Sequence, residues 1–366
     1  MYIWERPSWP DFRWQDARLL EPLAAARLKQ GQLLGGMARL GFDLRREAQF
    51  NALTEDVLKS SAIEGDMLDR NSVRSSLARR LGLPDAAAAA VDRRTEGVVD
   101  MLLDATENHD KPLTARRLCG WQAALFPTGY SGLHRVKTGR WRDDAQGPMQ
   151  VVSGPIGRQR VHYQAPPAAR LDTEMRRFLE WFNRKSGPEG LLRAGLAHLW
   201  FVTIHPFDDG NGRVARAIAN QALAQSEGSG QRFYSMSNQI QKERTGYYAM
   251  LERTQKGGLD VTQWLVWFLD CFSRALDGAE SARDNVLSKA DFWQRYAREL
   301  FTARQKVVLN RYLDGFEGKL TAKKWAAIGK CSVPTAQRDI NDLLERGILR
   351  RNPGGSKNTS YDLAGR

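Results

Sequence analysis

The sequence has few cysteines and no long apolar run. Its three cysteines, Cys119, Cys271 and Cys331, are odd in number and far apart. This argues against a disulfide-stabilised scaffold and predicts reduced thiols in a cytoplasmic protein. No stretch approaches the roughly 18 consecutive apolar residues of a membrane-spanning helix, and the N-terminal segment lacks the apolar core of a secretory signal. We therefore expect no membrane partner.

Two common kinds of site also lack their signatures. His109, His134, His162 and His198 show neither the H-E-x-x-H spacing nor a Cys/His spacing, so no zinc site is indicated. No G-x-x-x-x-G-K-[ST] string is present, so any phosphate binding does not use a Walker loop.

What the chain has in excess is positive charge. Its 366 residues carry 55 Lys or Arg and 42 Asp or Glu, a net charge of +13. The excess is uneven, because residues 301–366 hold 13 basic and 6 acidic residues. Hydrophobic residues at 42% and charged residues at 27% are typical of globular proteins. The composition thus predicts two or three folded domains, with a basic C-terminal module that suits a polyanionic partner.

The hydrophobic pattern is mostly helical. Apolar residues recur at helical spacing in seven segments: 54–68, 91–105, 115–126, 171–183, 191–204, 214–225 and 261–274. Polar helical residues up to about Glu299 predict a connecting helix, and Ala86–Ala90 resembles part of a helix or its approach. In contrast, residues 139–164 contain short β-branched runs broken by Gly and Pro, which predict a hairpin.

The string HPFDDGNGRVAR at residues 205–216 lies between two apolar helical segments. Gly210 and Gly212 leave room for a ligand near the backbone, and the free N–H groups of the following helix favour an anion. Arg213 and Arg216, three residues apart, share one helix face and could grip phosphates. Beside them, Asp209 is an oxygen ligand suited to Mg²⁺ bound with phosphates. His205 is the candidate general base because its ordinary pKa is near neutrality.

The alternative is a Gly-rich helix connection with solvated arginines. The string specifies too many positions for that alternative, so we interpret it as a phosphate site with a base.

The same string matches the H-x-F-x-[DE]-G-N-G-R-x-x-R pattern without departure, and here the chain resembles a Fic-domain protein. The resemblance extends over about residues 50–275 and implies a mainly α fold, a helical bundle with a β-hairpin flap over the active site. It also implies transfer of AMP from ATP to a Ser, Thr or Tyr hydroxyl of a target protein. His205 would take the hydroxyl proton and Asp209 would hold Mg²⁺. Phosphate binding is implied for the residues of the Gly-rich loop: Gly210, Asn211, Gly212, Arg213 and Arg216, the last at the γ-phosphate.

Residues 149–152 and 160–163 resemble the flap, which could bind an extended target segment by strand addition along Val151 and Val152. A plain structural hairpin is the open alternative. Tyr247 and Tyr248, on the next predicted helix, are candidates for the adenine pocket, with core packing as the alternative. The N-terminal Trp4, Trp9 and Trp14 resemble an extension found on such proteins, and we expect them to be buried in it.

The segment Ser60-Ser-Ala-Ile-Glu64-Gly65 resembles the inhibitory motif of Fic proteins. The resemblance implies that Glu64 forms an ion pair with Arg216, and an arginine already paired in this way cannot also hold a γ-phosphate. Ser60, one turn earlier, is expected to orient Glu64. The hypothesis is a self-inhibited adenylyltransferase. In some relatives this glutamate supports AMP removal, so a bifunctional enzyme remains an alternative.

The C-terminal pattern predicts three helices and a β-hairpin. Thr321 and Ser332 are placed to cap two of the helices and Gly347 to end the last. This succession resembles a winged helix-turn-helix, a small α+β domain whose second helix of the turn enters a DNA groove. The candidate DNA contacts on that helix and on the wing are Thr335, Gln337, Arg338, Asn341, Arg350 and Lys357. Protein docking or dimerisation is the alternative use of such a domain.

The predicted organisation has four parts. These are an N-terminal extension with the inhibitory helix (1–90), a Fic core (91–275), a connecting helix (276–300) and the winged domain (301–366). A second functional hypothesis is a DNA-binding regulator whose Fic domain senses nucleotide, although a sensor would not need the general base His205. The sequence leaves the donor nucleotide, the target and a homodimer open.

Overall fold

The computed structural model describes residues 1–83, 91–155, 158–313, 318–353 and 359–364. The chain divides into two compact units, Met1–Glu280 and Ser281–Arg366. Each unit has its own cluster of buried hydrophobic side chains, so each is described by itself. The predicted segment Ala86–Ala90 lies outside the described residues.

Helices make up most of the first unit. Among its described residues, ten α-helices lie wholly within this unit: α1 (Asp16–Ala38), α2 (Phe42–Ile63), α3 (Arg70–Arg80), α4 (Arg93–Glu107), α5 (Ala115–Leu125), α6 (Leu171–Phe182), α7 (Gly190–Ile204), α8 (Asn211–Glu227), α9 (Met236–Lys242) and α10 (Arg244–Gln255). Two 3-10 turns and two antiparallel hairpins complete the set: Ile3–Glu5, Ala168–Arg170, β1 (Tyr130–Ser131) with β2 (His134–Arg135), and β3 (Gln150–Ser153) with β4 (Arg160–Gln164). A further helix, α11 (Thr262–Arg295), begins in this unit and ends in the second.

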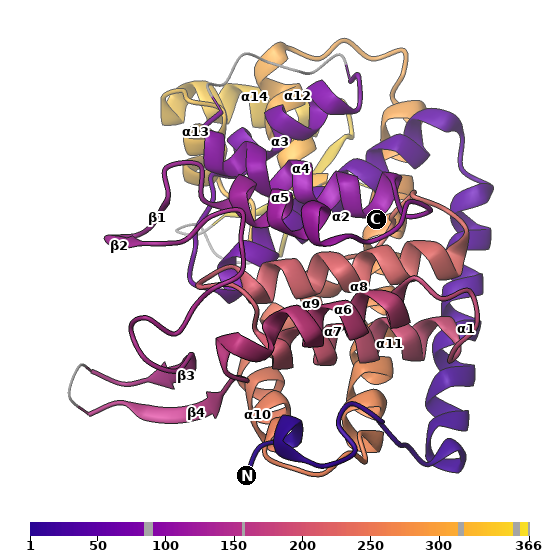
Figure 1. Ribbon diagram of the computed structural model, residues 1–366. Helices are drawn as coiled ribbons and strands as arrows, with labels where there is room; N and C mark the ends of the chain where they lie inside the picture. Colours follow the sequence, from indigo (N-terminus) through magenta and orange to yellow (C-terminus); the bar gives the residue numbers. More distant parts are fainter. Residues whose placement is uncertain (84–90, 156–157, 314–317, 354–358, 365–366) are drawn as a thin grey trace. The chain divides into compact units, whose positions relative to one another are not determined.

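The pair α7 and α8 forms the centre of the first unit (Figure 1). Helix α7 is apolar on every side, which is the pattern of a helix surrounded by others. Its residues from Leu191 to Ile204 are buried, with the single exception of Arg193. Because only six residues, 205–210, join the two helices, the C-terminus of α7 and the N-terminus of α8 lie together.

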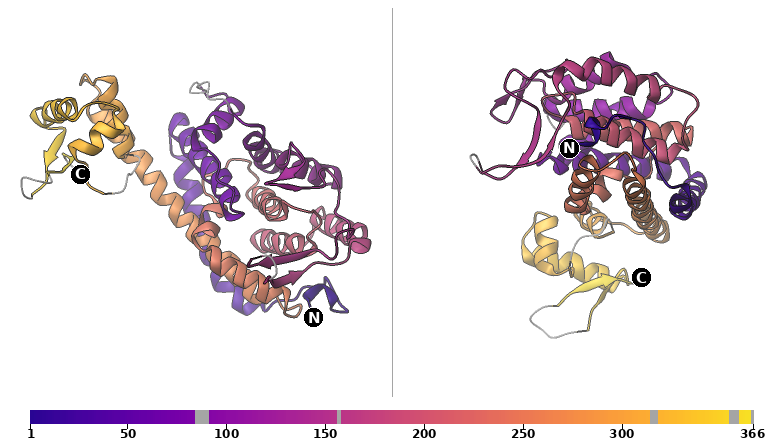
Figure 2. Two further views of the ribbon diagram at one scale, coloured as in Figure 1. Left: turned by 90° about the vertical axis from the view of Figure 1, so that its left-hand side faces the viewer. Right: turned by 60° about the horizontal axis from the view of Figure 1, so that its bottom comes forward.

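Helices α2, α4 and α5 pack against α8, while α6 packs against α7. A buried bond fastens α2 to α8, where Asn220 Nδ2 donates to Asp56 Oδ2 at 2.8 Å. Helix α1 runs beside α11 (Figures 1 and 2), and Lys29 Nζ contacts Asp277 Oδ1 at 2.7 Å. Because α2 packs against α8, the C-terminus of α2 lies near the α7–α8 loop.

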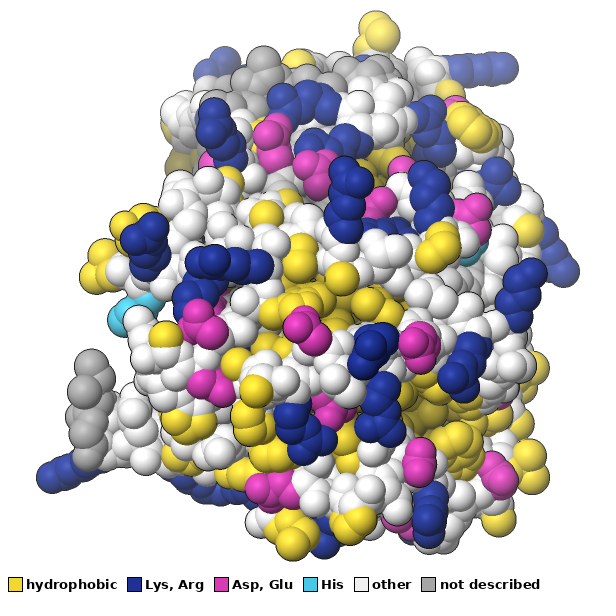
Figure 3. All heavy atoms as spheres, in the orientation of Figure 1, with side chains coloured by type: hydrophobic (Ala, Val, Ile, Leu, Met, Phe, Trp, Pro, Cys, Tyr) yellow, Lys and Arg dark blue, Asp and Glu magenta, His cyan; other side chains and the backbone are white. Residues whose placement is uncertain are grey.

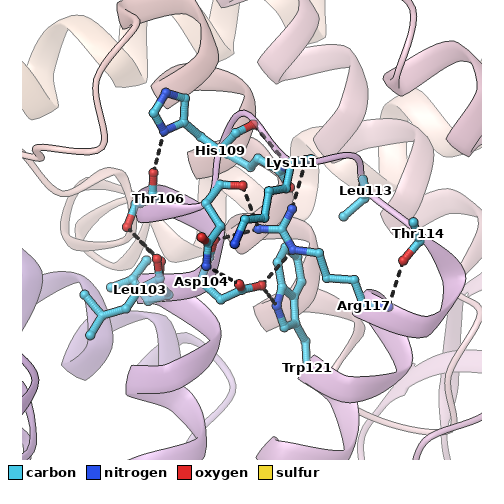
Figure 4. A network of polar contacts seen from close by, with 12 residues as sticks. Leu103, Asp104, Thr106, His109, Lys111, Leu113, Thr114, Arg117 and Trp121 are labelled. Atoms are coloured by element: carbon cyan, nitrogen blue, oxygen red, sulfur yellow. Dashed lines mark hydrogen bonds and ion pairs between the residues drawn. The ribbon is translucent and has the colours of Figure 1, made fainter.

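The turn between α4 and α5 is fastened by one carboxylate (Figure 4). Asp104 accepts hydrogen bonds from Arg117 Nε and Trp121 Nε1, each at 2.7 Å, across the two helices. Arg117 also donates to the Asp104 and Asn108 carbonyls. These contacts keep the pKa of Asp104 below its ordinary value although burial would raise it. The turn therefore holds α5 firmly beside the α7–α8 loop.

The N-terminal tryptophans pack as expected. Trp4 and Trp9 are buried and Trp14 is half-buried. Trp9 Nε1 donates to Glu174 Oε2 at 2.8 Å and Trp4 Nε1 to the Gln164 carbonyl at 2.8 Å. The first residues thus belong to the core of this unit.

The second unit contains the end of α11, three helices and one hairpin: α12 (Ala303–Leu313), α13 (Ala322–Ile328), α14 (Val333–Glu345), β5 (Leu349–Arg351) and β6 (Tyr361–Leu363). Thr321 and Ser332 accept the predicted capping bonds from Lys324 and Thr335. Gly347 follows α14 with φ +64°. The caps, the three helices and the hairpin are therefore those that the sequence predicts.

Some element boundaries differ from the prediction. We predicted a helix over 54–68, but α2 begins at Phe42 and ends at Ile63. The residues predicted as a connecting helix are helical up to Arg295, but they continue the preceding helix without a break, as α11 from Thr262 to Arg295. The seven predicted segments also omit α1, α3, α9 and α10.

On the face shown in Figure 3, positive charge is dispersed. Figure 3 shows Lys and Arg side chains over the helices of the first unit with Asp and Glu between them, not one basic patch. Among the described residues, no helix combines the length and the apolar character that crossing a membrane requires.

Candidate active site

His205 occupies the first position after α7 and ends that helix. Its backbone adopts the left-handed conformation, φ 51° and ψ 58°, which is uncommon for a residue other than glycine. The Arg142 guanidinium holds this turn, because its Nε donates to the His205 carbonyl at 2.8 Å. The histidine is thereby fixed at the entrance to the α7–α8 loop.

The His205 ring is arranged as a base. Its Nδ1 lies 3.1 Å from the Val202 carbonyl. A carbonyl only accepts, so Nδ1 carries the proton and Nε2 keeps its lone pair. Burial lowers the pKa of His205, and Arg142 lowers it further, against the Val202 carbonyl, Glu64 and Asp209, which raise it. The imidazole is therefore neutral at physiological pH.

Phe207 and Asn211 stabilise the loop from within. The Phe207 ring is fully buried and lies 5.0 Å from the Trp141 ring, centroid to centroid. Asn211 accepts from the Phe207 N–H at 2.9 Å and donates to its carbonyl at 2.7 Å. These bonds join the Asn211 amide to both backbone groups of Phe207, and the phosphate contact predicted for Asn211 stays a prediction. Asn211 is therefore a loop-fixing residue in this structure.

Gly210 and Gly212 are required by geometry. Gly210 has φ +89°, and a β-carbon there would lie 3.0 Å from the Phe126 ring. A β-carbon at Gly212 would overlap the Glu64 carboxylate. The second glycine thus lets a carboxylate reach the first turn of α8, where free N–H groups favour an anion.

Arg213 and Arg216 extend from the first turns of α8 and are 2% and 3% exposed. Arg213 Nη1 lies 2.8 Å from Asp66 Oδ2, and its guanidinium lies over the Phe126 ring. Arg216 Nη2 lies 2.8 Å from Glu64 Oε1. Arg213 Nε and Arg216 Nη1 are buried without a hydrogen-bond partner among the described residues. Since an unpaired buried N–H is costly, these two donors point to an anionic ligand.

Glu64 and Asp66 are presented by the end of α2. Gly65 has φ +86° and its N–H donates to the Ala62 carbonyl, while the Asp66 N–H donates to the Ser61 carbonyl, each at 3.0 Å. This pair of bonds is a Schellman turn, which glycine favours. The turn stops the helix at Ile63, earlier than predicted, and places Glu64 and Asp66 against the two arginines. Asp66, which also contacts Arg94, was missed in the sequence because a single acidic residue after a helix carries no signal.

The prediction for Ser60 is corrected. Its hydroxyl accepts from Arg216 Nε at 2.9 Å, and its carbonyl accepts from Arg216 Nη2 at 2.7 Å. Ser60 therefore orients the arginine and not Glu64. Burial alone would lower the pKa of Arg216, but Glu64 opposes it and the pKa lies above its ordinary value.

Asp209 is half-exposed beside this loop, and one of its carboxylate oxygens accepts from the Gly210 N–H. No cluster of three or more His, Cys, Asp or Glu suited to a metal exists among the described residues. A single carboxylate nevertheless fits Mg²⁺, which is commonly bound by one or two carboxylates together with substrate phosphates. The residues present therefore fit a metal that arrives with a nucleotide.

Arg142 is the main site residue that sequence reasoning missed. It is 3% exposed and joins the loop to the base of the second hairpin, since its Nη2 donates to the Pro166 carbonyl at 2.6 Å. Tyr163 on β4 makes a second link, donating from its hydroxyl to the Thr203 carbonyl at 2.6 Å. Arg142 belongs to no sequence motif, so the sequence alone does not identify it as a site residue.

The β3–β4 hairpin corresponds to the predicted flap and extends from the helical body (Figure 1). Val152 is 40% exposed and pairs with Val161, which is 37% exposed. Val151 is half-buried opposite Tyr163. The hairpin therefore presents exposed valines, and its attached end is tied to the 205–210 loop.

The two tyrosines of α10 have different surroundings. Tyr247 is 1% exposed and hydrogen-bonds His198 Nε2 at 2.8 Å, so the packing alternative describes it. Tyr248 is half-buried, and its hydroxyl donates to the Ile63 carbonyl at 3.3 Å and to Glu64 Oε2 at 3.4 Å. Burial raises the pKa of Tyr248 to about 12, with a further contribution from Glu64.

Comparison with known sequences assigns the residues of this site to two family matches. Residues 112–223 match the Fic/DOC family. The chain carries a Fic domain. Residues 2–83 match a second family, described as a domain of unknown function, DUF4172, so the segment with Ser60 and Glu64 lies within that match.

Relatives named protein adenylyltransferase Fic match part of the chain. That of Nematostella vectensis is 26% identical over 245 residues, which are 63% of this chain and 49% of the relative. That of Drosophila sechellia is 32% identical over 132 residues, which are 35% of this chain and 25% of the relative. The chain thus spans between a quarter and a half of the length of these curated relatives.

Two solved structures share the fold. A Fic family protein from Desulfovibrio desulfuricans G20 aligns over 95% of this chain and 96% of its own, with a TM-score of 0.53 and 22% identity. A Fic domain containing signaling protein from Bacteroides thetaiotaomicron aligns over 72% of this chain and 97% of its own, with a TM-score of 0.54 and 16% identity.

Proposed function

We propose that this protein is a self-inhibited adenylyltransferase that transfers AMP from ATP to a Ser, Thr or Tyr hydroxyl of a target protein. The observation that carries the proposal is the carboxylate of Glu64 at the first turn of α8, 2.8 Å from Arg216 Nη2. An anion already occupies the place where helix N–H groups and two buried guanidinium groups would hold phosphates. Glu64 therefore acts as a brake on ATP binding.

The chemistry follows from the positions of the site residues. The target hydroxyl oxygen attacks the α-phosphorus, its proton passes to His205 Nε2, and pyrophosphate leaves. Arg213 and Arg216 neutralise the triphosphate, with Arg216 at its far end once Glu64 has moved. Mg²⁺, held by Asp209 and the phosphates, would supply further neutralisation of charge. Alignment and charge stabilisation account for most of the acceleration expected in such a transfer.

The target is proposed to bind along the β3–β4 hairpin. An extended segment can add a strand to an exposed edge, with main-chain hydrogen bonds giving affinity. Exposed Val152 and half-buried Val151 would then contact apolar target side chains. A target bound there would have its hydroxyl near the 205–210 loop, because Arg142 and Tyr163 tie the base of the hairpin to that region.

Self-labelling with α-phosphate-labelled ATP tests the proposal. Glu64→Gly should raise labelling and ATP affinity at least about tenfold, equivalent to about 1.4 kcal/mol, and Glu64→Gln should give part of this gain because the charge is lost while the volume remains. Adding His205→Ala should abolish labelling without weakening ATP binding. Equal labelling of wild type and Glu64→Gly would refute the brake, and a bound nucleotide without transfer in any variant would refute the activity.

A second role is proposed for the C-terminal unit, which is DNA binding by a winged helix. Arg338 and Asn341 are exposed on α14 and Arg350 is exposed on β5. Thr335 and Gln337 are less available to contact DNA, because they already make hydrogen bonds within the unit. Thr335 bonds Ser332, and Gln337 bonds Asn341 and Tyr361. Lys357 lies outside the described residues. The exposed basic side chains support contact with phosphates.

A further inference from the structure

A histidine on the flap is displaced from the regular strand pattern. In the β3–β4 pair, Val151 lies opposite Tyr163 and Val152 opposite Val161. His162 is therefore the extra residue of a β-bulge. Bulges redirect a side chain and are frequent beside active sites, so the contacts of His162 are informative.

His162 connects a serine to a carboxylate. Its Nδ1 lies 2.7 Å from Glu252 Oε2 on α10, and its Nε2 lies 2.6 Å from the hydroxyl oxygen of Ser153 on β3. A carboxylate only accepts, so Nδ1 of the neutral ring carries the proton and Nε2 presents a lone pair to the serine hydroxyl. This is the hydrogen-bond order of an activated nucleophile, in which a carboxylate orients the base that takes the hydroxyl proton.

The carboxylate is held in its ionised form. Lys256 Nζ and Arg160 Nη2 contact Glu252 Oε1 at 2.7 Å and 3.1 Å. Hydrogen bonds from Lys256, His162 and Arg160 lower the pKa of Glu252 to about 2, although burial opposes them. The orienting group is therefore an acceptor throughout the physiological pH range.

The surroundings of Ser153 favour an anionic reaction partner. Ser153 is exposed, and the exposed Arg158 and Arg160 follow on the returning part of the hairpin. A neutral ester gains nothing from these cations, whereas a nucleoside triphosphate does. The hairpin also extends from the helical body (Figure 1), which makes Ser153 available to a second molecule.

We propose that Ser153 is an acceptor of AMP, modified in the active site of a second copy of this chain. The Ser153 hydroxyl oxygen forms a bond to the α-phosphorus of ATP, the bond to pyrophosphate breaks, and the proton passes to His205 Nε2 of the second copy, while His162 of the acceptor orients the hydroxyl as a positioning residue. The inference rests on the proposed adenylyltransferase activity. The added anionic group lies next to Val152, on the edge proposed for target docking, so the modification lowers target binding.

Peptide mapping by mass spectrometry tests the site in the full chain. Glu64→Gly is incubated with ATP and Mg²⁺ and mixed with full-length His205→Ala as an acceptor that has no activity of its own. AMP is expected on Ser153 of the His205→Ala chain, at a rate that rises with enzyme concentration. His162→Gln and Glu252→Gln in the acceptor are each expected to lower this rate at least about tenfold, because the Ser153 hydroxyl is no longer held in one orientation.

Matched variants separate the outcomes. Ser153→Ala in the acceptor should remove the AMP-bearing hairpin peptide, while Ser153→Thr should keep it and Ser186→Ala, a change at another exposed serine, should have no effect. AMP found on other residues but never on Ser153 would overturn the inference and leave the proposed activity standing. Ser153 modified at an unchanged rate in His162→Gln would overturn the role of the histidine. No AMP on any residue, with ATP bound, would instead refute the activity.

Discussion

At the scale of single residues, the site depends on how buried charges are satisfied. Arg213 and Arg216 are almost fully buried, yet each keeps one N–H without a partner among the described residues. Glu64 and Asp66 balance the two cations in this structure. The same two guanidinium groups can therefore receive either protein carboxylates or nucleotide phosphates, and the competition between them is the proposed regulation.

The lowered pKa of His205 predicts an acid-shifted activity profile. The histidine acts as a base only when neutral, and burial with Arg142 nearby lowers its pKa below the ordinary value of 6.5. As the pH falls through 6.5, the imidazole should stay neutral and kcat/KM of Glu64→Gly should be retained, decreasing only at lower pH. Calorimetric ATP binding at each pH is the control for ionisation of the nucleotide. A midpoint above 6.5 would contradict the prediction.

At the scale of elements, the site is the meeting point of four segments. The residue after α7 is the proposed base His205, α8 supplies the arginines, the end of α2 supplies the carboxylates, and the β3–β4 hairpin supplies the proposed docking edge. Arg142 links two of these segments, because it donates to the His205 and Pro166 carbonyls and to Asp144 Oδ1 at 2.9 Å. The rigidity of the catalytic loop thus depends on a residue outside the motif.

Replacing Arg142 should weaken this junction. Arg142→Met keeps much of the volume but leaves buried carbonyl groups without donors, so we expect a loss of about 2–4 kcal/mol in unfolding free energy. Urea unfolding measures it. Arg140→Met, at an exposed neighbour, is the control and should change stability by less than about 0.5 kcal/mol. Equal midpoints for the two variants would contradict the role given to Arg142.

Helices were predicted better than their ends. The segments that became α5, α6 and α7 were located to within about one residue because their apolar period is clear. The end of α2 was misplaced by five residues, because it depends on the positive φ of Gly65 and on the contacts of Glu64 and Asp66 with distant arginines. A local pattern does not contain those contacts.

At the scale of the whole molecule, the chain combines a Fic-containing unit with a smaller unit that has a separate core. The excess of basic residues in 301–366 belongs to that smaller unit. The proposed nucleic-acid binding by this unit can be tested by replacing basic residues and by varying the salt concentration. This test does not depend on the transfer reaction.

If the second unit binds DNA, the affinity of the full chain for a duplex should fall steeply with salt. Replacing both Arg338 and Arg350 by Ala should weaken binding and lower the slope of log K against log salt by about 2, one for each lost phosphate contact. Replacing Arg184 and Lys185 by Ala in the first unit makes the same change in net charge and should leave the slope nearly unchanged. Salt-independent binding, or equal effects of the two double variants, would argue against DNA recognition by this unit.

The sequence by itself determined the mainly helical fold, the loop at 205–216 and the glutamate that could oppose its arginines. The first two follow from local causes, which are periodicity, glycine conformation and the spacing of charges along one helix. The glutamate was predicted from the resemblance of residues 60–65 to the inhibitory motif of Fic proteins. Only the tertiary structure decided which partners meet: Asp66 with Arg213, Ser60 with Arg216, Asn211 with Phe207 and Ser153 with His162. The first two contacts join residues 147 and 156 positions apart, which only packing brings together. Asn211 and Phe207 are four positions apart and Ser153 and His162 are nine, but their contacts depend on the conformation of the loop and on the register of the hairpin.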